Sequence, residues 1–523
     1  MTIGFRVLLA MLALGLALPA QARSSPEAAC AELARTAAPA AAAIGSVVVG
    51  AGAWDPAAGA MAFFARMPGM NPAGHVSEGP NVPFCRVFLT LRPTPASDIR
   101  VELWLPLTGW NGKFMAAGNF GWGGTIMHPL MLAPLQQGYA VASTDTGHDS
   151  ATSGQGGAFA LGQPEKLIDY AWRADHAMTV AAKALIRAFY GRGPVHSYWV
   201  GCSLGGLEGL IEAKRFPADY DGIVAGAPPN PLTAFNAAQL WPSALVRRNP
   251  AGLIPKEKLA MVHAAVLKAC ATPIGQQEGV VDRPLSCAFD PGTLRCNAGD
   301  GADCLTGAQV DLLRQVYAGP VNPRTGAILF PGPAHGSELE LEPFISAKPF
   351  PNALDLFRYV AFADPDWDPA TLDWDAGLAA AMAKVGPLLH VDADLRPFFA
   401  RGGRLLLYIG WNDYHHPAEL ADYYARLVRT AGPASARSVR LFTIPGMGHC
   451  FGGAGCDTFD KLGTIDTWVS THRAPERITA SRVEAGKVIR TRPICSWPLL
   501  AGYRGAGATE TAESFACVAD PPR

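Results

Sequence analysis

The residues Gly201-Cys202-Ser203-Leu204-Gly205 match the pattern G-x-S-x-G, which in many hydrolases surrounds a nucleophilic serine. The pattern directly follows an apolar run that predicts a strand, Ser197–Val200, and directly precedes a predicted helix, Leu204–Arg215. In this context the glycines permit a sharp turn that presents the serine side chain at the edge of a sheet. The sequence therefore predicts that Ser203 is a nucleophile rather than an idle serine in a glycine-rich turn.

A serine hydroxyl becomes a good nucleophile when a histidine accepts its proton and an acid orients that histidine. In α/β-hydrolases the acid and then the histidine follow the serine along the chain, on loops after later strands. Asp413 follows a predicted strand at Arg404–Ile409, and His449 follows another at Val439–Ile444. We therefore expect Ser203, Asp413 and His449 to form a catalytic triad.

Other histidines are weaker candidates for the base. His415 and His416 follow the same predicted strand as the expected acid, and no clear acid at a strand end separates them from the serine. Asp145 and His148 also follow a strand but precede the serine, so we expect a structural role or a place in the pocket wall. His176 lies within a predicted helix and is expected to be a packed side chain.

The second amide of an oxyanion hole is expected on a glycine-rich loop after an earlier strand. Leu204, directly after the nucleophile, supplies the first amide. The loop Gly118–Gly124 is the suitable earlier loop, and Gly121 is the favoured donor, with Asn119 and Gly123 as alternatives.

The elements that must position these residues alternate between strands and helices. Apolar runs bounded by turn residues predict strands at Val87–Leu89, Val101–Leu105, Lys113–Ala117, Tyr139–Thr144 and Gly222–Gly226, and periodic patterns predict helices at Pro164–Tyr190 and Pro417–Thr430. Such alternation is typical of an α/β fold with a parallel sheet covered on both faces. The alternation is interrupted between Pro228 and Pro397, a region with four cysteines and many prolines.

This interruption predicts an α/β-hydrolase core in two parts, residues 23–227 and 398–523, separated by a large inserted lid domain at residues 228–397. Residues 1–22 are expected to be an export signal. Arg6 precedes the apolar run Val7–Leu18, and Ala20-Gln21-Ala22 forms a small-x-small cleavage site. A secreted or periplasmic location follows from this expectation.

The composition excludes other classes of protein. The chain has 523 residues, of which 43 are basic and 44 acidic, and 49% of its residues are hydrophobic against 17% charged. Nearly balanced charge provides no basic surface for nucleic acid, and the apolar content is unlike that of a disordered chain. No later apolar run is long enough for a membrane span, so no membrane association is expected after signal cleavage.

Eleven cysteines in an exported protein predict five disulfides and one free thiol. No C-x2-C pair occurs, so we expect no zinc site. Cys202 directly precedes the expected nucleophile and Cys450 directly follows the expected base. A disulfide between these two residues would tie the two catalytic loops together.

The chain resembles the tannase and feruloyl esterase family, which includes mono(2-hydroxyethyl) terephthalate hydrolases. The resemblance covers nearly the whole mature chain and is carried by the segments 143–148, 197–206, 219–228, 410–413, 445–453 and 492–495. It implies that Ser203, Asp413 and His449 are the triad. It also implies the disulfides Cys30–Cys85, Cys202–Cys450, Cys270–Cys287, Cys296–Cys304 and Cys495–Cys517, with Cys456 free.

Two departures from the family pattern are visible. In the family the cysteine pair matching Cys270 and Cys287 encloses an aspartate-rich calcium loop, but the ligand positions here are Ala271, Ile274 and Glu278. Because calcium prefers several carboxylates, we expect no cofactor and at best a weak calcium site. Leu204 and Leu207 replace residues that are often polar or arginine in relatives, which affects the expectation about substrate more than that about reaction type.

The resemblance implies an exported serine carboxylesterase acting on small esters of aromatic acids, such as gallates, hydroxycinnamates or terephthalate monoesters. Aromatic residues of the insertion are candidates for holding the acyl ring: Trp241, Phe344, Phe357, Trp367 and Trp374. Two alternatives remain open at this point. One is a serine esterase, lipase or peptidase of other specificity, and the other is a ligand-binding protein on the same scaffold. The sequence leaves the oligomeric state open.

Overall fold

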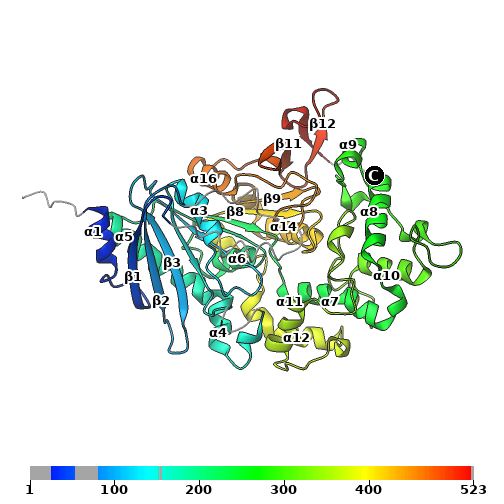
Figure 1. The fold of residues 1–523 in the computed structure, drawn as a ribbon, viewed down its shortest axis with the longest axis horizontal. Helices are drawn as coiled ribbons and strands as arrows, with labels where there is room; N and C mark the ends of the chain where they lie inside the picture. Colours follow the sequence, from blue (N-terminus) through cyan, green and yellow to red (C-terminus); the bar gives the residue numbers. More distant parts are fainter. Residues whose placement is uncertain (1–24, 54–79, 151, 153–155, 520–523) are drawn as a thin grey trace, which may run out of the picture.

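The computed structural model describes residues 25–53, 80–150, 152 and 156–519 (Figure 1). A nine-stranded sheet runs through the molecule in the order β1-β2-β3-β5-β4-β6-β7-β8-β9. Helices pack against the sheet, and a further group of helices lies beyond it. The expected export signal, residues 1–22, falls outside the described residues.

The strands of the sheet agree closely with the predicted strands, except that β1 was not predicted. They are β1 (Ala41–Val49), β2 (Phe84–Leu91), β3 (Ile99–Pro106), β4 (Lys113–Ala117), β5 (Ala140–Thr144), β6 (His196–Cys202), β7 (Gly222–Gly226), β8 (Arg404–Gly410) and β9 (Val439–Ile444).

The six strands from β5 to β9 are parallel, but β1, β2 and β3 form an antiparallel edge. The expectation of a parallel sheet is therefore wrong for this edge. The connection from β2 to β3 contains only residues 92–98, whereas a parallel crossover needs a dozen residues or more.

The helices that follow the strands were predicted in part, because those at His128–Gln136 and Lys461–Thr471 were not expected from the sequence. The longer helices of the core are α3 (His128–Gln136), α5 (Ala174–Tyr190), α6 (Leu204–Arg215), α14 (Pro417–Ala431) and α16 (Lys461–Thr471). The predicted helix at Pro164–Tyr190 consists of α4 (Pro164–Ile168), a π-helical turn (Asp169–Arg173) and α5. The core also contains two shorter helices, α1 (Pro26–Leu33) and α15 (Ser435–Ser438).

Neighbouring residues of β7 show that helices cover both faces of the sheet. A side chain at Gly222 would meet Ile465 of α16, whereas Ile223 lies beside Gly209 of α6. Successive residues of a strand point to opposite faces, so α16 and α6 lie on opposite sides. The strands β7 and β8 are accordingly buried over their whole length.

Residues 228–397, the expected lid, connect β7 to β8 and contain helices and loops without a strand of the main sheet. These helices are α7 (Leu232–Arg248), α8 (Lys256–Cys270), α9 (Pro273–Glu278), α10 (Gly307–Ala318), α11 (Pro351–Asp355) and α12 (Ala376–Leu389). The expected end of the lid falls inside α13 (Arg396–Ala400), which packs on α6 and α14 of the core.

The C-terminal part of the described chain adds two hairpins that the sequence patterns did not indicate. They are β10 (Arg477–Glu484) with β11 (Lys487–Cys495), and β12 (Leu500–Tyr503) with β13 (Phe515–Val518). In Figure 1 the hairpins lie near α9 of the inserted region.

Five disulfides join the same pairs that the family resemblance implies, and Cys456 is a buried free thiol. The Cys202–Cys450 bond spans 248 residues of sequence, and the Cys495–Cys517 bond spans 22. Within the described residues, no helix combines the length and apolar character needed to cross a bilayer.

The difference in span gives a prediction for stability. By chain entropy, a loop as long as that of Cys202–Cys450 contributes at most about 5.5 kcal/mol to the free energy of unfolding, against about 3.4 kcal/mol for a loop as short as that of Cys495–Cys517. We expect urea unfolding to show a larger loss for the double variant Cys202→Ala/Cys450→Ala than for the control Cys495→Ala/Cys517→Ala. Equal losses, or a larger loss in the control, would contradict this ranking.

Candidate active site

Ser203 occupies the turn between β6 and α6 in a backbone conformation that side chains rarely adopt. Its φ is 61° and its ψ is −126°. The backbone N–H of Ser203 donates a hydrogen bond of 2.9 Å to the carbonyl of Gly226, at the end of β7. Strain of this kind, held by a neighbouring strand, is typical of a serine presented above the edge of a sheet.

The glycines on both sides of Ser203 are required by close backbone approach. A Cβ atom at Gly201 would lie 2.3 Å from the carbonyl oxygen of Gly205, and one at Gly205 would lie 2.9 Å from that of Asn119. The N–H of Gly205 donates to the same Asn119 carbonyl at 2.7 Å. The turn is therefore packed directly against the loop that follows β4.

Asp413 and His449 lie on loops after β8 and β9, and the structure brings them together. His449 Nδ1 lies 2.9 Å from Oδ1 and 3.0 Å from Oδ2 of Asp413, and both side chains are buried. The Asp413 carboxylate also accepts the backbone N–H of His415 at 2.8 Å. Burial raises the pKa of Asp413, and the hydrogen bond from His415 acts in the opposite direction.

Burial lowers the pKa of His449 to about 3, so its imidazole is neutral near pH 7. With Nδ1 hydrogen-bonded to Asp413, the other ring nitrogen, Nε2, is the proton acceptor. Nε2 lies 3.7 Å from Sγ of Cys450, a disulfide sulfur that carries no proton, so this contact leaves the lone pair of Nε2 unprotonated. His449 and Ser203 line the same cavity. The arrangement can therefore accept a proton from the serine hydroxyl.

The cavity at Ser203 is narrow, with a volume of about 60 Å³. Small-molecule sites usually enclose about 300–1,000 Å³, so wall side chains must move when a substrate enters. Its walls are largely aromatic, and the residues Phe120, Trp122, Phe235, Phe350 and Tyr414 contribute to them.

The aromatic residues expected to hold a substrate ring do not line this cavity. Trp241 packs on Trp374 at 4.8 Å between ring centres, and Phe357 packs on Trp367 at 5.4 Å, within the inserted region. Phe344 lies behind the wall, 5.2 Å from the ring of Tyr414. Phe235 and Phe350 of the same insertion line the cavity instead.

The other candidate histidines have different surroundings. His415 Nδ1 lies 2.8 Å from the carbonyl of Ala227, and its ring packs 4.0 Å from that of His449, so His415 forms part of the cavity wall. His416 packs edge-on against Phe330. His148 stacks on Phe159, and Nδ1 of His176 lies 2.6 Å from Oδ2 of Asp219; neither of these histidines lines the cavity.

Hydrogen bonds distinguish the three candidates for the second oxyanion donor. The backbone N–H of Asn119 donates to Glu208 at 2.9 Å, and that of Gly123 donates to the carbonyl of Phe120 at 2.9 Å. Gly121, with a φ of 56°, lines the cavity together with Leu204. Two of the three amides are thus already bonded, which favours Gly121.

Comparisons with known proteins identify the family of this chain. Residues 85–518 match the family model described as tannase and feruloyl esterase. The chain belongs to the tannase and feruloyl esterase family. It is therefore a member of a family of carboxylic ester hydrolases with an α/β-hydrolase fold.

Individual relatives cover most of both chains. The chain is 34% identical to an uncharacterised esterase of Xanthomonas campestris over 84% of its own length and 85% of the relative's. It is 32% identical to the mono(2-hydroxyethyl) terephthalate hydrolase of Piscinibacter sakaiensis, over 81% and 82% of the two chains. The crystal structure of feruloyl esterase B from Aspergillus oryzae superposes with a TM-score of 0.84 at 28% identity, covering 94% of this chain and 100% of that one.

Within this esterase fold, Glu208 is a residue that the sequence analysis missed. It lies on α6, five positions after Ser203, and is 1% exposed. Its Oε2 accepts the Asn119 N–H, while the Asn119 side chain donates to the carbonyl of Thr144 at 2.9 Å. Glu208 thereby fixes the glycine-rich loop against the helix that carries Leu204. Glu208 and Glu212 lie four positions apart, so they share a face of the helix that follows the nucleophile, and this pair was the available signal.

This contact predicts a role for Glu208 in positioning the loop. We expect Glu208→Leu to lower kcat for ester hydrolysis by about tenfold to a hundredfold with little change in KM, because a shift of about 1 Å in a catalytic group has effects of that size. Glu208→Gln, which keeps an acceptor oxygen, should retain most activity.

Glu212→Leu is the matched control, because Glu212 is equally buried one turn further along α6, but its carboxylate makes no hydrogen bond to the glycine-rich loop within the described residues. Equal losses of kcat in Glu208→Leu and Glu212→Leu, at matched thermal stability, would show that Glu208 has only a structural role.

Proposed function

We propose that the protein is an exported serine carboxylesterase that hydrolyses esters of aromatic acids through an acyl-enzyme on Ser203. The observation that carries this proposal is the buried His449–Asp413 pair, which faces the same cavity as a serine held at a strained turn between strand and helix. Export is supported by five disulfides, which persist in oxidising compartments.

In the proposed reaction, Ser203 Oγ attacks the ester carbonyl carbon while His449 Nε2 accepts the serine proton. The carbonyl oxygen becomes an oxyanion, which the backbone amides of Leu204 and Gly121 stabilise. His449 then donates the proton to the departing alkoxide, so that the alcohol leaves and the acyl group remains on Ser203. Water, activated by His449, attacks this ester, and the acid departs as Ser203 regains its proton.

Asp413 has two tasks in this scheme. Its hydrogen bond to Nδ1 keeps the proton of neutral His449 on that nitrogen, so that Nε2 is the basic one. Its negative charge then stabilises the imidazolium that forms during each proton transfer.

The aromatic walls of the cavity support the substrate class. A planar acyl group can pack against rings such as Phe235, Phe350 and Tyr414, and each aromatic pair is worth about 0.5–1.5 kcal/mol beyond the area buried. The names of two relatives, a feruloyl esterase and a terephthalate monoester hydrolase, point to the same class of acid.

The function is tested with purified protein on methyl gallate, methyl ferulate, chlorogenate, a terephthalate monoester and short aliphatic p-nitrophenyl esters. We expect the highest kcat/KM on an aromatic-acid ester. Ser203→Ala should remove turnover by at least about a thousandfold without loss of fold, because it deletes the nucleophile. Turnover of the aliphatic esters alone would overturn the substrate class, and full activity of Ser203→Ala would overturn the mechanism.

The lowered pKa of His449 predicts the pH dependence of the reaction. The imidazole must be neutral to accept a proton, so activity is present above its pKa and is lost as the pH falls through it. We expect the acid limb of kcat/KM to be centred below about 6.5, the ordinary value for histidine. Each sample is returned to pH 7.5 and assayed again, which separates protonation from unfolding. A reversible acid limb centred at or above the ordinary value would contradict the prediction.

A further inference from the structure

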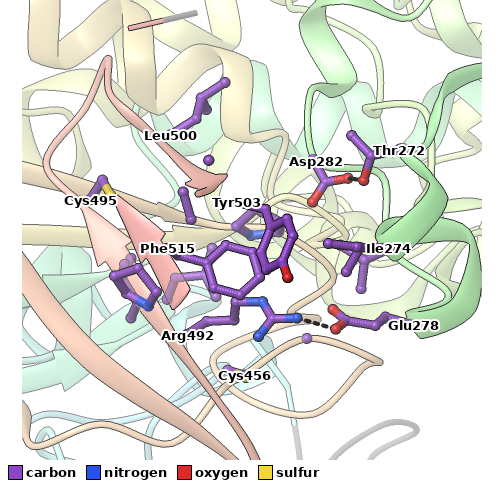
Figure 2. A pocket seen from close by; sticks show the side chains of 18 of the residues that line it. Thr272, Ile274, Glu278, Asp282, Cys456, Arg492, Cys495, Leu500, Tyr503 and Phe515 are labelled. Atoms are coloured by element: carbon purple, nitrogen blue, oxygen red, sulfur yellow. Dashed lines mark hydrogen bonds and ion pairs between the residues drawn. The ribbon is translucent and has the colours of Figure 1, made fainter. Parts of the chain in front are cut away.

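A second cavity lies between the inserted region and the C-terminal hairpins, as Figure 2 shows. Its volume is about 680 Å³, far larger than that of the cavity at Ser203, and the two cavities share no lining residue. This volume is within the usual range for small-molecule sites. The wall contributed by the insertion comes from α9 and the loop after it, within the segment closed by the Cys270–Cys287 disulfide.

This segment is where the family resemblance implies a calcium loop, and the residues present do not fit calcium. Ala271 and Ile274 carry no side-chain oxygen. Glu278, the remaining carboxylate, accepts a hydrogen bond from the guanidinium of Arg492, and its other oxygen lies 3.7 Å from Nε of Arg490. The guanidinium groups of Arg490 and Arg492 already lie beside this carboxylate, and their positive charges would repel a divalent cation.

The arginines outnumber the carboxylates that face them. Arg490 and Arg492 are two positions apart on β11, so both side chains point to one side of the strand. Their side chains are only 14% and 13% exposed, and both meet the single carboxylate of Glu278. The whole cavity wall contains three arginines and two carboxylates.

Arg490 retains unused hydrogen-bonding capacity. One terminal nitrogen donates to the backbone carbonyl of Ala454, whereas the buried Nε makes no hydrogen bond within the described chain and has only the ion pair with Glu278, at 3.7 Å. A buried donor without an acceptor is costly, and an added acceptor in the cavity would relieve that cost. Arg492, by contrast, is held by Glu278 and by the ring of Phe515, which lies 3.9 Å from its guanidinium carbon.

The remaining walls of the cavity are mainly apolar, with a few polar side chains such as Thr272 and Gln277. Ile274 of the insertion lies across the pocket from Phe515 of the hairpins in Figure 2, and Leu500, Ile444 and Val518 add further apolar surface. A ligand that fits this cavity therefore needs an anionic oxygen to accept hydrogen bonds from the Arg490 guanidinium, and an apolar body to pack against the apolar walls.

We propose that this cavity binds an organic monocarboxylate with an apolar body, its carboxylate on Arg490 and its body between α9 and the C-terminal hairpins. Carboxylate is the oxygen anion that matches the planar guanidinium fork best at a single charge. The site is separate from the proposed catalytic cavity and does not depend on the proposed esterase activity.

The test uses the full mature chain carrying Ser203→Ala, with 3-phenylpropanoate as the probe and its uncharged amide, 3-phenylpropanamide, as the comparison. Isothermal titration calorimetry should show binding of the carboxylate and at least about tenfold weaker binding of the amide, as expected for loss of a charge-assisted hydrogen bond. Arg490→Gln should weaken binding of the carboxylate by a similar factor.

Arg482→Gln is the matched control, because Arg482 lies on the paired strand β10 and is not part of the cavity wall. It should bind the carboxylate as the parent does. No binding of the carboxylate, equal binding of the amide, or unchanged affinity in Arg490→Gln would overturn the proposal.

A measurement without a substituted arginine covers the case in which Arg490→Gln does not fold. Cys456 is the free thiol, and it lines this cavity. Saturating 3-phenylpropanoate should slow modification of Cys456 by methyl methanethiosulfonate at least about fivefold, since the ligand fills the space beside the thiol. An unchanged rate at saturation would place the ligand elsewhere and overturn the proposal.

Discussion

The hydrogen bond between His449 and Asp413 is the interaction on which the account of this esterase depends. This bond joins the loops that follow β8 and β9. Both residues are buried, and Asp413 has no surface exposed to solvent. Parallel neighbours in one sheet place their carboxyl ends at one edge, which is why residues 36 positions apart in sequence meet there. The Cys202–Cys450 disulfide joins the histidine loop to the serine turn, so the same edge is closed covalently.

Buried ionisable groups have different roles at three places in the structure. At the proposed catalytic site, burial keeps His449 neutral and able to accept a proton. At the second cavity, a carboxylate of the inserted segment meets two guanidinium groups of a C-terminal strand, at the place where relatives are expected to hold calcium. Glu208 is a third case, in which a buried carboxyl group fixes the glycine-rich loop rather than taking part in chemistry.

Much of the core could be predicted because its signals are local. Strands such as β8 are continuous apolar runs, and the G-x-S-x-G pattern lies between a strand and a helix, so periodicity and motif agree. The edge strand β1 was missed because Ala41–Val49 begins with small residues and is only partly buried. The rings that line the cavity, the Glu208–Asn119 contact and the second cavity all depend on contacts between distant segments, which no local pattern encodes.

The central claim is that Asp413 makes His449 a base for Ser203, and a fluorophosphonate probe measures this directly because it reacts with an activated serine. The second-order rate of labelling, with the modified peptide identified by mass spectrometry, is compared between the wild-type protein and Asp413→Asn. The account predicts labelling of Ser203 alone, slowed by about a thousandfold or more in the variant, whose amide cannot hold the same tautomer of His449. Labelling at another residue, or the same rate in Asp413→Asn, would contradict it.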